Sequence, residues 1–170
     1  HTNLDITRGG VNDVLAERLG LEKLSTFITT AQADGSAESL GRIGTLPAPV
    51  AIDDFAHSGR ERRGVSHVRL VRAADRPVRR VAGVGGAGAE FIDTAVRRGA
   101  DVYLTGDVKY HEAQRAAEQG MHLIDAGHFG TERPVLPVLA DLLRAELAAE
   151  HGTVEILVTE TQRDVFDVII

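Results

Sequence analysis

The stretch VRRVAGVGGAGAEF, residues 78–91, indicates the fold class of this 170-residue chain. It begins as an apolar run typical of a buried strand and ends where the apolar spacing becomes helical. Gly83, Gly85 and Gly88 have the G-x-G-x-x-G spacing of dinucleotide-binding turns. Tight strand-to-helix turns need glycine as well. The glycines, Gly86 among them, therefore predict either a dinucleotide site or a turn that keeps side chains out of a cleft and offers backbone N–H groups to a substrate phosphate.

Toward the C-terminus, short apolar runs alternate with amphipathic segments. Strands alternating with helices of about 10 to 13 residues predict βαβ units with right-handed crossovers. The fold class is therefore α/β, with a mainly parallel sheet in the second half. The sequence predicts strands at 78–84, 102–105, 122–125 and 154–160, and helices at 89–98, 110–119 and about 137–149.

The first half is less regular. Residues 11–19 have helical apolar spacing and are followed by Gly20, which suits the end of a helix. Residues 29–49 are rich in Gly, Ser, Ala and Pro and predict a long connection with a short strand at 41–46. One or two helical turns are expected at 52–56, and a strand is expected from His67.

Composition narrows the function classes. A net charge of −6 argues against general nucleic-acid binding, and no apolar run is long enough to span a membrane. Eight arginines lie between residues 60 and 80. They predict either a basic patch that binds phosphates or an acidic partner surface, or simply a solvated loop and the outer face of a strand. Cysteine is absent, so a metal ion must be held by His, Asp, Glu or water.

Polar residues follow three predicted strands, in GVGGAG, TGDVKYH and DAGHFGTERP. Because ligands of open α/β sheets bind beyond the carboxyl ends of the strands, we expect these segments to share one rim. Pro134 and Pro137 delay the next helix, so His128 and Glu132 are predicted on a loop. An imidazole and a carboxylate four residues apart suit a divalent metal. Alternatively, the histidine is hydrogen-bonded to a helix N-terminus and the glutamate is favoured by the helix dipole.

Two other segments carry candidate groups. In HTNLD, Asp5 is either an anionic metal ligand or part of an Asx turn, and His1 is a ligand, a hydrogen-bond donor to one, or the start of a strand. In TGDVKYHEA, Asp107 is either the ribose-binding acid of a dinucleotide site or a polar wall near metal ions. His111 is either a general acid or base or a histidine at a helix start.

Taken in order, HTNLD with GGVNDVLAERLGL, TGDVKYHEA and DAGHFGTE resemble the NGG-interacting-factor-three-like family. Its bacterial members are labelled GTP cyclohydrolase type-two homologues or dinuclear metal-centre hexameric proteins. LGRIGTLP at 40–47 and VAGVGGAG are also similar to family segments, so the resemblance covers nearly the whole chain.

The resemblance implies two interlocked α/β lobes, a ring of six copies, and two divalent ions facing an inner cavity. By position, the metal ligands carry over to Asp5, His128 and Glu132, while the family's His-His pair has no counterpart and is expected upstream. The chain then corresponds to the C-terminal two thirds of such a protein, and the segment between Leu24 and Leu40 leaves no room for an inserted signalling-like domain. The ions are Zn, Mn, Fe, Ni or Mg.

The leading hypothesis is a cytoplasmic metal-dependent hydrolase that acts on GTP or another nucleotide-like small molecule. His111 and His1 are then candidates for proton transfer, and Lys109, Asp107 and Gly86 for substrate binding. The alternative is a metal-binding, ring-forming scaffold or regulatory protein without catalysis. A dinucleotide-binding domain is a third possibility.

Overall fold

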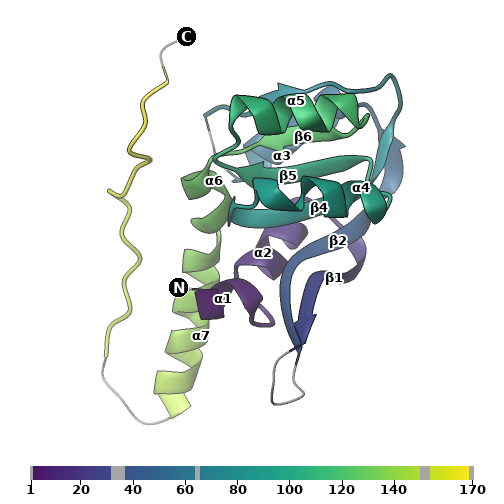
Figure 1. Ribbon diagram of the computed structural model, residues 1–170. Helices are drawn as coiled ribbons and strands as arrows, with labels where there is room; N and C mark the ends of the chain where they lie inside the picture. Colours follow the sequence, from purple (N-terminus) through teal and green to yellow (C-terminus); the bar gives the residue numbers. More distant parts are fainter. Residues whose placement is uncertain (1, 32–36, 64–65, 150–153, 169–170) are drawn as a thin grey trace.

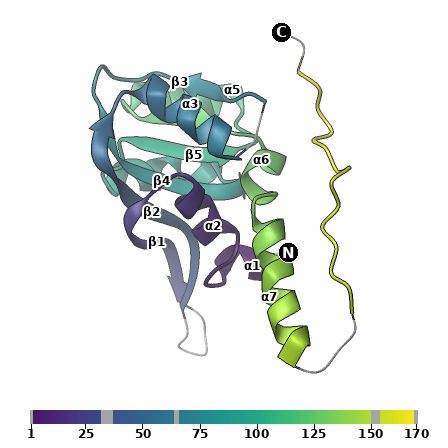
Figure 2. The same cartoon turned by 180° about the vertical axis from the view of Figure 1, so that it is seen from behind.

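The computed structural model describes residues 2–31, 37–63, 66–149 and 154–168 (Figure 1). Within these ranges, six strands form one sheet in the order β1-β2-β4-β5-β6-β3. Helices cover both faces of the sheet, as the two opposite views show (Figures 1 and 2). The fold is therefore α/β.

The second half contains the predicted βαβ units. Strand β4 (Val78–Ala87) pairs in parallel with β5 (Val102–Gly106), which pairs in parallel with β6 (His122–Asp125). A 3-10 turn (Ala89–Phe91) and α4 (Ile92–Arg97) lead from β4 to β5, and α5 (Tyr110–Glu118) leads from β5 to β6. The parallel half of the sheet is confirmed, and antiparallel strands flank it on both sides.

Alternation along the parallel strands builds a core on each face of the sheet. Val102 and Leu104 belong to the core beneath α2 (Val11–Arg18) and α3 (Ile52–Arg63). Tyr103, between them, belongs to the core beneath α4 and α5. Successive strand side chains point to opposite faces, so each strand is buried on both sides.

The short strand predicted at 41–46 lies within a longer strand, but the long connection predicted around it is wrong at residues 29–31 and 37–49, and residues 32–36 lie outside the described ranges. Strand β1 (Glu22–Ala31) and strand β2 (Ala37–Val50) form an antiparallel pair at one edge of the sheet. Phe27 and Ile43 are each 1% exposed, so the hairpin is held by burial despite its turn-like composition. A side chain at Gly41 would meet the Gly83 carbonyl at 2.7 Å, so glycine in β2 permits close strand contact and does not signal a loop.

Other boundaries also differ from prediction. Helix α3 runs through three turns and not one or two, and β3 (Arg69–Val71) is only three residues long. Helix α7 (Val135–Ala149) begins before Pro137, which lies in its first turn, where a missing N–H loses no helical partner. The predicted strand at 154–160 is wrong: the segment is extended but pairs with no strand among the described residues.

Helix α2 ends as predicted, with Gly20 in the left-handed region at φ 71°. Helix α7 and the extended segment after it lie at one side of the sheet (Figures 1 and 2). Among the described residues, none of the helices has the length and apolar character needed to cross a membrane.

Candidate functional site

The three strand ends meet at one rim, as the sequence predicts. His128 Nδ1 lies 2.7 Å from Asp107 Oδ2, and His128 Nε2 lies 3.0 Å from Glu132 Oε1. Asp107 follows β5, whereas His128 and Glu132 follow β6. The imidazole is therefore held between two carboxylates that come from neighbouring strand ends.

His128 and Glu132 lie in a short helix, α6 (His128–Glu132), and not on the predicted loop. Pro134 and Pro137 both come after Glu132, so they delay α7 without preventing a helical turn before it. Residues four apart in a helix lie on the same face. The helix therefore explains how these two side chains reach each other.

Asp125 ties together the two loops that carry this pair. Its carboxylate accepts hydrogen bonds from the backbone N–H groups of Val108, at 3.1 Å, and Gly127, at 3.0 Å. It is 8% exposed and also pairs with Arg69, whose guanidinium donates to the Val108 carbonyl at 2.7 Å. These bonds fix the loop before α5 relative to the loop before α6.

Gly86 leaves space beside the pair. Its φ is 69°, and a side chain there would meet Glu132 Oε1 at 2.6 Å and the His128 Nε2 atom at 3.3 Å. The Gly86 N–H donates to Thr131 Oγ1 at 2.9 Å, which fixes the glycine against α6, so this N–H is not the phosphate donor considered from the sequence. This gives the glycine stretch a role other than a dinucleotide turn. Imidazole and carboxylate groups are the types of donor that divalent ions bind.

Asp5 lies in helix α1 (Thr2–Ile6) and not in the Asx turn considered above. It lines the same cavity as His128 and Glu132. Burial raises the pKa of Asp5, and the charge of His128 acts in the opposite direction. The three side chains thus influence one another across the cavity, although α1 and α6 are far apart in sequence.

The electrostatics follow from this crowding. The hydrogen bond to Asp107 raises the pKa of His128, and the charges of Glu132 and Asp107 add to this effect against the opposing effect of burial. Burial raises the pKa of Glu132, and the nearby carboxylates of Asp5 and Asp107 raise it further. Carboxylates repel one another here, so a cation between them would relieve the repulsion.

The cavity has a volume of about 990 Å³. Apolar walls are provided by α1, α2, α6 and α7, and cationic groups by Arg69, Arg133 and Arg163. Arg133 lies over the ring of Phe129, 5.7 Å from its centroid. Ser66 and His67 also line the cavity, with 3.0 Å between the serine hydroxyl and His67 Nδ1.

Two of the remaining predicted residues lie away from this cavity. Lys109 and His111 are exposed at the start of α5 and are not among the lining residues, and the His111 ring contacts Tyr110 edge-on at 5.9 Å. His1 lies outside the described residues. In the part of the chain that the structure describes, no group of three or more His, Asp or Glu side chains is arranged to hold a metal ion.

Sequence reasoning missed the residues that organise the rim. Asp125 carries a signal, because a carboxylate that ends a buried strand has to find donors. Asn12, 1% exposed, gives none, because asparagine near a helix start is ordinarily a capping residue.

Comparison with known proteins covers nearly the whole chain. The family model described as Duf34/NIF3 (NGG1p interacting factor 3) matches residues 1–165. A protein of Clostridium perfringens named GTP cyclohydrolase 1 type 2 homolog is 31% identical over 169 residues, which cover 99% of this chain and 63% of that protein. A Nostoc protein of the same name is 36% identical over 147 residues, which cover 85% of this chain and 54% of that protein.

Among solved structures, a Bacillus cereus protein related to NIF3 superposes with a TM-score of 0.91 at 23% identity. The match covers 99% of this chain and 72% of that one. It supports the fold alone. The chain spans less than two thirds of the length of both named relatives.

Proposed function

The chain belongs to the Duf34/NIF3 family, and from this premise and the rim described above we propose that it is a divalent-metal-dependent hydrolase acting on a nucleotide-like substrate. One observation carries the proposal. The His128 ring is held at 2.7 Å by Asp107 and faces Glu132 at 3.0 Å, beside a glycine that leaves space, at the edge of a cavity.

His128 Nε2 and the carboxylates of Glu132 and Asp5 are the groups that would hold an ion. A bound divalent ion supplies Lewis acidity, which polarises a carbonyl, ring or phosphoryl centre and makes water a better nucleophile near neutral pH. The family resemblance assigns two ions to such a site. By the same resemblance, we include the second ion and a ring of six copies in the proposal. We also include further ligands from another part of the protein, because this chain spans only part of its relatives.

Asp107 has a positioning role in this proposal. Its carboxylate accepts the hydrogen bond of His128 Nδ1 and so directs Nε2 toward Glu132 and Gly86. Histidines that bind metals commonly donate their second N–H to a carboxylate, which fixes the tautomer and the ring orientation. Asp125 supports the same geometry, because it holds the backbone on both sides of the pair.

The substrate class follows from the cavity and from the relatives' names. A cavity of about 990 Å³ has the size of small-molecule sites. Arg133 and Arg163 on its walls suit a substrate with anionic groups, whereas Arg69 is already paired with Asp125. Because the curated relatives are named GTP cyclohydrolase 1 type 2 homolog, GTP and related nucleotides are the first substrates to test.

Metal uptake by the purified chain tests the site. Isothermal titration with Zn²⁺ or Mn²⁺ should show saturable binding that His128→Ala abolishes. The matched control is His57→Ala, since His57 is an exposed histidine on α3 that does not line the cavity. Equal uptake by the His128→Ala variant and the unsubstituted chain would refute the assignment.

Turnover separates the hydrolase from a non-catalytic metal-binding protein. The metal-loaded protein should release product from at least one member of a panel of nucleotides and phosphoesters. Full metal occupancy without any hydrolysis would favour the scaffold or regulatory alternative.

A further inference from the structure

Asn12 connects the two sides of the cavity through a buried amide. Its Nδ2 donates to the Asp5 carbonyl at 2.7 Å, and its Oδ1 accepts from the Gly85 N–H at 2.9 Å. Both contacts agree with one orientation of the amide, because the flipped amide would set a donor against a donor and an acceptor against an acceptor. The Asn12 side chain is 1% exposed, so the amide itself is withdrawn from solvent.

The Asp5 side of the cavity depends on such anchors. Helix α1 has only five residues, too few to be stable without tertiary contacts. Leu4 is partly buried and packs against the small core of Val11, Val14 and Val135. The hydrogen bond from Asn12 to the Asp5 carbonyl acts on the backbone of the candidate ligand itself.

The other side of the cavity depends on the same amide. Gly85 precedes Gly86, the residue that faces His128 and Glu132. Helix α2 approaches β4 closely here, because a side chain at Gly85 would meet Val11 Cγ1 at 2.6 Å. Asn12 therefore spans from the backbone of Asp5 to the backbone beside Gly86.

We propose that Asn12 is a positioning residue that sets the Asp5 carboxylate against the His128–Glu132 pair without contacting an ion. The inference rests on the proposed function, because it concerns the geometry of the same ion site. The amide is required because it is both donor and acceptor. Aspartate at this position keeps the acceptor for Gly85 but sets an oxygen against the Asp5 carbonyl, and the repulsion moves α1 away.

The test compares Asn12→Asp with a variant that perturbs the same helix elsewhere. Leu15→Ala removes a buried side chain of α2 that packs in the core beneath α2 and α3 and does not line the cavity. Each protein is titrated with Co²⁺, and the affinity and the visible absorption bands of the bound ion are recorded. Circular dichroism verifies that every variant is folded at the temperature used.

Asn12→Asp should bind Co²⁺ about 10- to 100-fold more weakly and with altered bands, as expected when a group that orients a ligand is lost. Leu15→Ala should keep the affinity and the bands of the unsubstituted chain despite its lower melting temperature. If Asn12→Asp does not fold, Asn12→Ser replaces it, because a hydroxyl is too short to reach both partners, and the same outcomes apply.

If a folded Asn12 variant kept the Co²⁺ affinity and absorption bands of the unsubstituted chain, this inference would be overturned but the proposed function would not. The same would follow if Leu15→Ala lost Co²⁺ as strongly as Asn12→Asp, because the effect would then come from general destabilisation. Absence of Co²⁺ binding by the unsubstituted chain, or retention of binding by His128→Ala, would overturn the proposed function and this inference with it.

Discussion

At the scale of single residues, two glycines with the same backbone conformation have different tasks, one at the rim and one at the end of α4. Gly86 and Gly99 have nearly the same left-handed backbone, with φ of 69° and 67°. The two glycines differ in their surroundings. A side chain at Gly86 would meet Glu132 and His128, whereas nothing lies within 4 Å of a side chain at Gly99. Comparing alanine substitutions at the two glycines therefore distinguishes backbone strain, which both share, from crowding of the site, which occurs only at Gly86.

We expect Gly86→Ala and Gly99→Ala to lose similar stability, about 1 kcal/mol each, since both force alanine into the left-handed region. The clash at position 86 is mainly with the mobile end of Glu132, so it displaces the site more than it unfolds the protein. Urea denaturation gives the free energies of unfolding, and NMR of the His128 ring reports the displacement. Ring shifts that are unchanged by Gly86→Ala would contradict this role of the glycine.

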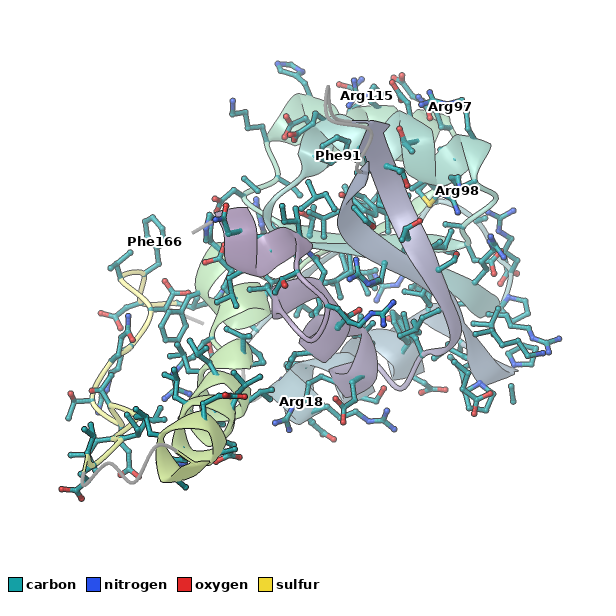
Figure 3. All side chains as sticks on the ribbon, turned by 90° about the horizontal axis from the view of Figure 1, so that it is seen from below. Arg18, Phe91, Arg97, Arg98, Arg115 and Phe166 are labelled. Carbon is teal, nitrogen blue, oxygen red and sulfur yellow. The ribbon has the colours of Figure 1, made fainter. Side chains whose placement is uncertain are left out.

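At the scale of elements, polar contacts attach helices to the antiparallel edge of the sheet. Asp13 on α2 pairs with Arg42 on β2 and accepts from the Gly9 N–H at 2.6 Å. Burial raises the pKa of Asp13, but the hydrogen bonds from Arg42 and Gly9, together with the charges of Arg42 and Arg8, outweigh it and lower the pKa. On the opposite face of the sheet, Arg98 (labelled in Figure 3) follows α4 and donates to the Thr26 and Phe27 carbonyls of β1, at 3.1 and 2.7 Å.

Asp13→Asn should lower the free energy of unfolding at pH 7 by about 2 kcal/mol, because the guanidinium of Arg42 loses its charged partner. A carboxyl with a lowered folded pKa stabilises above its ordinary value of 3.8, and this contribution disappears as the pH falls through the folded pKa. The difference from the unsubstituted chain should thus shrink in acid. The control is Asp54→Asn on α3, an exposed carboxylate, and a deficit that persisted undiminished in acid would argue against the ion pair.

Arg98→Ala should speed amide exchange in β1 about fivefold, which corresponds to roughly 1 kcal/mol of lost local stability. Arg97→Ala is the matched control, because Arg97 bonds to Thr94 within its own helix, at 2.8 Å. Hydrogen exchange measured by NMR resolves β1 from the rest of the sheet. Equal acceleration by the two variants would show that Arg98 does not hold this strand.

At the scale of the whole molecule, the two cores share the parallel strands. Leu15 lies in the core beneath α2 and α3, and Tyr103 lies on the opposite face, 5.6 Å from Phe27 between ring centroids. Because neighbouring residues of one strand serve both cores, loosening one face should destabilise the other. Outside this shared core lie α7, with Leu142 and Leu143 exposed, and the extended segment that carries Phe166 (Figure 3).

Leu15→Ala should cost about 2 to 5 kcal/mol, the usual range for removing a buried leucine side chain. The near-ultraviolet signal of Tyr103 and the far-ultraviolet helix signal should shift to lower urea concentration together. Separate midpoints for the two signals would mean that the faces of the sheet unfold independently.

Sequence alone was sufficient where burial is periodic and local. The strand at 122–125 matches β6, and the helix after Gly10 ends before Gly20 as expected. Because parallel strands place their carboxyl ends on one rim, the meeting of the segments around Gly86, Asp107 and His128 also followed from the pattern. The hairpin at the edge was missed, because Gly, Ser and Pro are tolerated where a partner strand provides the hydrogen bonds and the burial.

Tertiary structure alone decided how the rim is held. The helical turn that brings Glu132 to His128 depends on packing against Gly86, and the buried amide of Asn12 finds its acceptor 7 residues away and its donor 73 residues away. A propensity describes the neighbours of a residue along the chain. Hydrogen bonds of buried groups are determined by neighbours in space, which exist only once the sheet has formed.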